Sequence, residues 1–151
     1  MSLDDLYREV ILAHYKRPHN HGELPGADIA IEGKNPACGD ELKLQLKLSE
    51  GKVSEVRFSG HGCAISQSSA SMMTDQLKGK TLDEAFQLAE DFKSMIRGER
   101  KAQMPGDLEA LRGVTKFPVR VKCATLAWST LQYAISEQRT SGRLATGYVE
   151  R

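Results

Sequence analysis

Long apolar runs, a strong net charge and an even set of cysteines are all missing from this 151-residue chain. No stretch comes near the roughly 18 apolar residues of a membrane-spanning helix, so no membrane association is expected. The net charge of +1 provides no basic surface for nucleic acid. Residues 1–5 are acidic and lack a signal-peptide pattern, and we therefore expect a cytoplasmic protein. In that compartment thiols stay reduced, so the three cysteines favour metal or redox chemistry over disulfides.

Apolar spacing predicts one helix followed by a small sheet. Leucines at positions 42, 44, 46 and 48 alternate with polar residues, as in a strand with one buried face. Residues 49–52 form a hairpin turn into a partner strand at 53–58, and residues 27–32 form a first strand. An antiparallel sheet of about three strands, exposed to water on one face, is expected. The helix before it ends where Arg17 precedes Pro18, and its apolar stripe consists of Leu3, Leu6, Tyr7, Val10, Ile11 and His14.

Helical signals dominate the second half of the chain. A helix follows Gly62, and a capping box at residues 81–84 begins another. Residues 107–112 form one short helical turn or two, and the final helix starts near Pro118 and runs to about residue 138. Residues 140–151 show little periodicity, so we expect one folded domain at 1–139 and a mobile tail after it. The predicted fold class is α+β, with helices packed on one face of a small antiparallel sheet.

Each of the three cysteines lies in a segment suited to presenting a thiolate. Cys38 is in a loop between two predicted strands, and Gly39 allows the side chains of Cys38 and Asp40 to face one point. Cys63 is at a glycine-rich turn that enters a helix, and Cys123 is in the first turns of the last helix. Three thiolates and one carboxylate are a full tetrahedral set for Zn²⁺, or a complete shell for a small iron–sulfur cluster.

Taken singly, each cysteine also has an ordinary explanation. Cys38 is consistent with an incidental residue in a tight turn, and Cys63 and Cys123 with small buried hydrophobes. His61 could ligate the metal or hydrogen-bond a ligand, whereas His14 is expected to be a satisfied core residue. The other two histidines are expected to be solvated in a loop. Three basic residues flank the ligands and either favour the thiolates or are surface charges; they are Lys34, Arg120 and Lys122.

Three ordered blocks carry a resemblance to a known superfamily. They are residues 35–40, 60–66 and 117–128, with the sequences NPACGD, GHGCAIS and FPVRVKCATLAW. Together with the first helix and its exit at residues 15–20, they resemble the U-type iron–sulfur scaffold superfamily, that is, the NifU N-terminal or IscU-like proteins. The resemblance runs over nearly the whole chain and implies a SufE/NifU-like fold.

Two features place the resemblance in the SufU branch. The IscU branch has a histidine immediately before the third cysteine, where this chain has Lys122. The SufU branch lacks that histidine and has extra helical residues between the second and third cysteines. This chain has such a stretch at residues 98–112.

The resemblance implies a zinc-dependent sulfurtransferase. It would accept persulfide sulfur from a SufS-like cysteine desulfurase and deliver it to downstream iron–sulfur assembly proteins. By motif, zinc would be bound by Cys38, Asp40, Cys63 and Cys123. Cys38 would be the sulfur acceptor and Arg120 a supporting residue. Two alternatives stay open: a scaffold that assembles a [2Fe–2S] cluster and transfers it, and a purely structural zinc domain.

Overall fold

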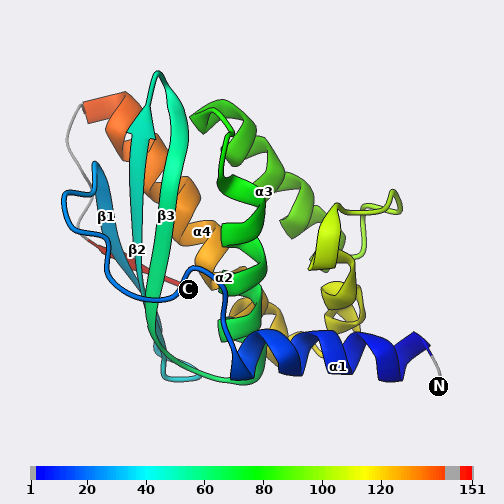
Figure 1. Cartoon of the computed structure of the whole chain (residues 1–151). Coiled ribbons are helices and arrows are strands. Elements are labelled where there is room, and N and C mark those ends of the chain that lie inside the picture. Colours follow the sequence, from blue (N-terminus) through cyan, green and yellow to red (C-terminus); the bar gives the residue numbers. More distant parts are fainter. Residues whose placement is uncertain (1–2, 142–146, 151) are drawn as a thin grey trace.

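In the computed structural model, which describes residues 3–141 and 147–150, the helices lie on one side of a single sheet (Figure 1). This arrangement confirms the predicted α+β class with helices on one face. No helix within residues 3–141 is both long and apolar enough for a membrane span. The elements are α1 (Leu3–Lys16), β1 (Ile29–Asn35), β2 (Asp40–Ser49), β3 (Lys52–His61), α2 (Ala64–Leu77), α3 (Leu82–Ile96), the 3₁₀ helix η1 (Gly106–Lys116), α4 (Pro118–Ser141) and β4 (Gly147–Val149).

The first three strands form the predicted antiparallel meander. Leu44 of β2 is opposite Ile31 of β1 on one side and Phe58 of β3 on the other, and all three are buried. The β2–β3 turn has Glu50 and Gly51 with φ of 54° and 78°. Two successive positive φ values match the twist of a tight hairpin, which explains the glycine.

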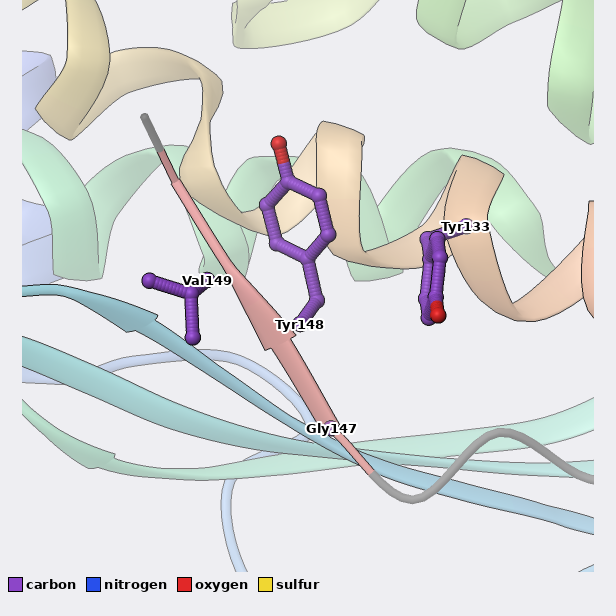
Figure 2. Close-up of a pocket in the computed structure, with 4 residues that line it drawn as sticks. All are labelled: Tyr133, Gly147, Tyr148 and Val149. Atoms are coloured by element: carbon purple, nitrogen blue, oxygen red, sulfur yellow. The ribbon is translucent and has the colours of Figure 1, made fainter.

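Among the described residues the sheet has a fourth strand, in addition to the three antiparallel strands that were predicted. The order is β3-β2-β1-β4, and β4 runs parallel to β1. Its three residues come from the segment predicted to be a mobile tail. Tyr148 turns toward α4, with its ring centroid 5.6 Å from that of Tyr133 (Figure 2). A three-residue strand with one anchoring side chain gives too short a sequence pattern to be predicted. Residues 142–146 lie outside the described part of the chain.

Two helices cover the sheet directly. α4 comes so close to β1 that a Cβ atom on Gly33 would collide with the hydroxyl of Thr130. α2 and α4 are joined through Ser69, whose hydroxyl donates to the Ala124 carbonyl at 2.6 Å. The same hydroxyl accepts the indole N–H of Trp128 at 3.0 Å, and the Trp128 ring stacks on Phe92 of α3 at 4.5 Å. The small side chain of Ser69 therefore allows α2 and α4 to pack closely and fixes the position of one helix against the other.

The opposite face of the sheet is partly covered, contrary to the expectation that water wets it. Gln45 of β2 is only 8% exposed. Its side-chain amide donates to the Leu24 carbonyl and its oxygen accepts the Leu24 N–H, both at 3.1 Å. The segment between α1 and β1 also borders β3, because the Gly22 N–H donates to the Phe58 carbonyl at 2.9 Å. A loop thus covers part of the face and the free edge of β3.

The predicted helices are confirmed, with one difference in length. Thr81 and Glu84 form the reciprocal capping box at the start of α3, and α4 begins at Pro118. η1 is longer than the one or two turns expected, at 11 residues. His14 is buried as predicted, and both of its ring nitrogens have hydrogen-bond partners.

Candidate metal centre

The β1–β2 loop presents Cys38 and Asp40 at the end of the sheet. The N–H groups of Cys38 and Gly39 both donate to the Asn35 carbonyl, at 3.3 and 2.9 Å. Gly39 has φ of 71°, in the left-handed region where glycine is favoured. This tight turn leaves Cys38 exposed, whereas Asp40 is 1% exposed. One exposed sulfur and one buried carboxylate therefore border the same loop.

Cys63 is the N-cap residue of α2. Its sulfur accepts the Ser66 N–H at 3.5 Å, and its own N–H donates to Asp40 Oδ1 at 3.0 Å. Gly62 makes this approach possible, because a Cβ atom there would lie 2.6 Å from Asp40 Oδ1 and would also collide with the Ser66 hydroxyl. The turn before α2 thus holds the carboxylate of Asp40 in place through the backbone.

Cys123 completes a group of three potential ligands. It is fully buried in α4, and its sulfur lies 3.4 Å from the Cys38 sulfur. One ligand atom each of Cys38, Asp40 and Cys123 lies within 4.8 Å of the other two. Within the described residues, the sulfur of Cys63 is not part of this 4.8 Å group.

Electrostatics nevertheless link all three sulfurs. Burial raises the pKa of the Cys123 thiol, and the neighbouring Cys38 sulfur, the Asp40 carboxylate and the charge of Cys63 raise it further. A hydrogen bond with Cys123, followed by the charges of Cys63 and Cys38, raises the pKa of the exposed Arg120 guanidinium. Arg120 and Cys63 therefore both lie close enough to Cys123 to act on it electrostatically.

The buried polar atoms test whether these residues suit a metal ion. Asp40 Oδ2 is buried with no hydrogen-bond partner among the described residues, and the same is true of both polar side-chain atoms of Asn35. An unpartnered buried acceptor is unfavourable by about 1–3 kcal/mol. A cation on Asp40 Oδ2 would remove that penalty, and two adjacent sulfurs with a carboxylate oxygen are donors that Zn²⁺ accepts. The donor set fits zinc.

The structure separates the remaining sequence candidates from this group. The side chain of His61 is 72% exposed, and its Nε2 lies 3.2 Å from Glu41. Lys122 is exposed, and Lys34 lies 4.0 Å from the same glutamate. No role was predicted for Asn35, which is paired with Asp40 in the β1–β2 ladder and is 1% exposed. Its signal was available: Asn35 shares the buried face of β1 with Ile29 and Ile31, where a polar side chain is unusual.

Comparisons with known proteins identify a family and similar relatives. The model of the family described as "NifU-like N terminal domain" matches residues 6–142. The chain is 46% identical over 144 residues to the iron-sulfur cluster assembly scaffold protein IscU of Streptococcus pyogenes serotype M1, covering 94% of this chain and 90% of that protein. It is 44% identical over 139 residues to the zinc-dependent sulfurtransferase SufU of Bacillus subtilis strain 168, covering 91% and 94%.

A solved structure extends the likeness to three dimensions. It is that of a putative iron-sulfur cluster assembly scaffold protein for the SUF system from Fervidobacterium islandicum AW-1. Its TM-score to this chain is 0.81 at 36% identity, and the match covers 89% of this chain and 99% of that one.

Proposed function

Because the chain belongs to the NifU-like N-terminal domain family, we propose that it is a zinc-dependent sulfurtransferase of the SufU type. In this role the chain accepts persulfide sulfur from a SufS-like cysteine desulfurase. It then delivers the sulfur to downstream iron–sulfur assembly proteins. Relatives of both types match nearly the whole chain. The proposed localisation is the cytoplasm, because this function requires free thiols and cytoplasmic thiols stay reduced.

Zinc is assigned to Cys38, Asp40, Cys63 and Cys123. The support is the 4.8 Å group of Cys38, Asp40 and Cys123, together with the unpartnered Asp40 Oδ2. Bound zinc would supply the positive charge that keeps thiols ionised at neutral pH. Cys63 donates its backbone N–H to Asp40, and its sulfur is the proposed fourth ligand.

Cys38 is the proposed sulfur acceptor, and its exposure is the observation that carries the proposal. Cys123 is buried and Cys63 intermediate, so Cys38 is the thiol that a partner can reach. Its thiolate attacks the outer sulfur of the partner's cysteine persulfide. A new S–S bond forms to Cys38, the old S–S bond breaks, and the partner's cysteine leaves as a thiolate. No external oxidant or reductant is needed.

Arg120 is proposed to support this transfer through its charge. The exposed guanidinium has a hydrogen bond with Cys123, and this contact raises the pKa of Arg120. A positive charge there favours the approach of an anionic persulfide. Arg120 acts on the reacting sulfur without forming a bond to it.

Metal analysis combined with desulfurase turnover tests this proposal. We expect colourless protein with stoichiometric zinc, which accelerates the cysteine turnover of a SufS-like desulfurase. Cys38→Ala should stay folded and abolish the acceleration, whereas the control His61→Ala should retain it, because His61 faces Glu41 rather than the sulfurs. Acceleration by Cys38→Ala equal to that of the unsubstituted chain would refute the proposal.

The same experiment distinguishes the two alternatives. A brown protein that passes an intact cluster to an apo-ferredoxin would identify a [2Fe–2S] scaffold instead. A protein with zinc that never changes desulfurase turnover would identify a structural zinc domain. Lys122 in place of the histidine of the IscU branch is what favours the transferase over the scaffold.

A further inference from the structure

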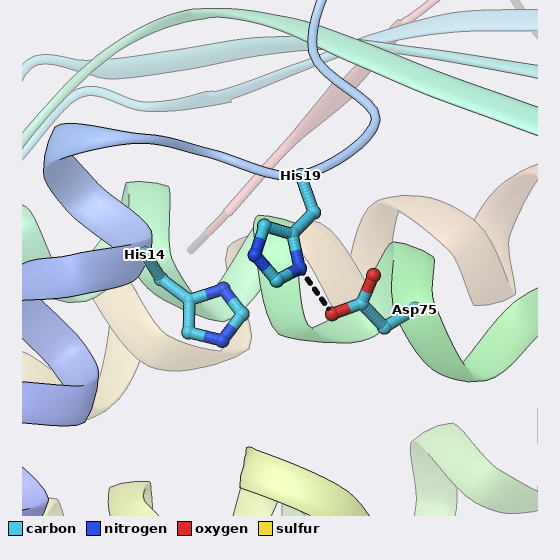
Figure 3. A group of neighbouring side chains, drawn as sticks. All are labelled: His14, His19 and Asp75. Atoms are coloured by element: carbon cyan, nitrogen blue, oxygen red, sulfur yellow. Dashed lines mark hydrogen bonds and ion pairs between the residues drawn. The ribbon is translucent and has the colours of Figure 1, made fainter.

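A second group of potential metal ligands, made of other residues, lies where the chain leaves α1 and passes α2. His14 is in the last turn of α1, His19 follows Pro18, and Asp75 is in the last turn of α2. One ligand atom of each lies within 4.8 Å of the other two. Figure 3 shows the two imidazole rings and the carboxylate turned toward one another. Two imidazoles and one carboxylate are a common donor set for divalent transition ions.

The loop that carries His19 is fixed on α2. The His19 N–H donates to Ser71 Oγ at 2.8 Å. The Asn20 amide donates to Thr74 Oγ1 at 3.0 Å and to Asp75 Oδ1 at 3.3 Å. Asn20 has φ of 53°, so the chain makes a sharp turn at this point. Little ordering would therefore be required of His19 and Asp75 when an ion binds.

His14 is oriented as metal-bound histidines are. It is 3% exposed, and its Nε2 lies 2.8 Å from Asp107 Oδ2 of η1. A carboxylate on the far nitrogen fixes the ring and makes the other nitrogen a better donor. That other nitrogen, Nδ1, lies 2.7 Å from Ser71 Oγ. Ser71 is thus the group that must turn away, or become a ligand itself, if Nδ1 is to reach an ion.

We propose that His14 Nδ1, His19 and Asp75 bind a divalent transition ion such as Zn²⁺ or Co²⁺, with Asp107 as the outer carboxylate. The two aspartates bring two negative charges to the group, which a divalent ion would balance. The side chains of His19 and Asp75 are 52% and 35% exposed, so an ion can enter and water can complete its shell. The ion would join α1, α2 and η1 at one point.

A metal-free hydrogen-bond network is the competing explanation. His19 Nδ1 lies 2.6 Å from Asp75 Oδ2, and Ser71 satisfies His14. In that case the three side chains only fasten the exit loop to α2. The two explanations differ in one measurable respect, the uptake of a second metal ion.

Cobalt titration of the full, untagged, metal-stripped chain separates them. Co²⁺ bound by cysteines shows sulfur-to-metal charge transfer, whereas Co²⁺ on nitrogen and oxygen shows only weak d–d bands. We expect equilibrium dialysis to find two ions per chain, one of each kind. His19→Ala and Asp75→Asn should each remove the second ion, and Asp107→Asn should weaken it by about 10- to 100-fold. The control His21→Ala, an exposed histidine outside the group, should keep both ions.

The result is decisive in either direction. Absence of the sulfur-free ion, or its persistence in both His19→Ala and Asp75→Asn, would overturn the proposal. The amide of Asp75→Asn can still hydrogen-bond. If Asp75 only fastens the loop to α2, this substitution should therefore leave the number of bound ions unchanged. The proposal is independent of the sulfurtransferase assignment: failure of the cysteine site would appear as missing charge transfer, with the second ion still present. Buried His14 is left intact so that every variant can fold.

Discussion

Gly62→Ala is expected to weaken metal binding without changing a single ligand. The new Cβ atom would lie 2.6 Å from Asp40 Oδ1, too close for any contact, and would also meet the Ser66 hydroxyl. Either the Asp40 carboxylate or the turn that carries Cys63 must move. In both cases the Cys63 N–H loses its 3.0 Å hydrogen bond to Asp40.

The size of the effect follows from that bond. A hydrogen bond to a charged group contributes about 1.5–3 kcal/mol. About 1.4 kcal/mol corresponds to a factor of ten, so zinc affinity should fall by about 10- to 100-fold. Loss of a partner that positions a ligand typically has an effect of this size. Gly62 has no positive φ, so the prediction depends on space alone and not on backbone strain.

Competition with a chromophoric zinc chelator measures the change. Gly113→Ala is the matched control, because that glycine also has no positive φ and nothing lies within 4 Å of the added atom. Thermal unfolding of both metal-free variants shows whether the fold is retained. Zinc affinity of Gly62→Ala equal to that of the Gly113→Ala control would refute the account of how Asp40 is held.

Three further predictions concern the core, the charge network of η1 and metal uptake. Gly33→Ala should lower the free energy of unfolding by about 1–3 kcal/mol in urea, since its Cβ would collide with Thr130; Thr130→Ala in the same chain should recover part of the loss, and full stability of Gly33→Ala would contradict the packing. Arg112 donates to Glu109 at 2.8 Å, and this hydrogen bond lowers the pKa of the Glu109 carboxyl below its ordinary value. The pair therefore stabilises the fold above the ordinary pKa of glutamate, and the contribution is lost as the pH falls through the lowered pKa. Glu109→Gln should therefore lower stability by about 1–3 kcal/mol at pH 7 and by much less at pH 3, whereas an equal loss at both would contradict this assignment. Because the pKa of the Cys123 thiol is raised, zinc must displace its proton, so affinity should rise with pH by about tenfold per unit for each proton released; a pH-independent affinity would exclude Cys123 as a ligand.

Local patterns in the sequence predicted most of the fold. Leucines alternating along β2, the capping box of α3 and Pro118 at the start of α4 each act within a few residues, and each is found where expected. β4 escaped prediction because its stability comes from pairing with β1, far away in the chain, and from Tyr148 on α4. The burial of Gln45 escaped for the same reason, since only the folded loop brings Leu24 over it.

The site was predictable in its residues but not in its geometry. Cysteine and aspartate at turns and helix starts identified the candidates, because these positions expose backbone N–H groups. Which ligands meet depends on how α2 and α4 pack, and there the sulfur of Cys63 lies outside the group formed by Cys38, Asp40 and Cys123. The same limit applies to His14, whose buried position follows from helical periodicity but whose contacts with Ser71 and Asp107 do not.

The indole of Trp128 gives this protein a built-in optical reporter. It is the chain's sole tryptophan, and it contacts both Phe92 and the Ser69 hydroxyl, five residues after Cys123 on α4. Its ultraviolet emission therefore reports on one junction, the one where the two cysteine-bearing helices are joined. Any event that shifts α2 against α4, whether ion loading or docking of another protein, can be followed in real time without attaching a dye.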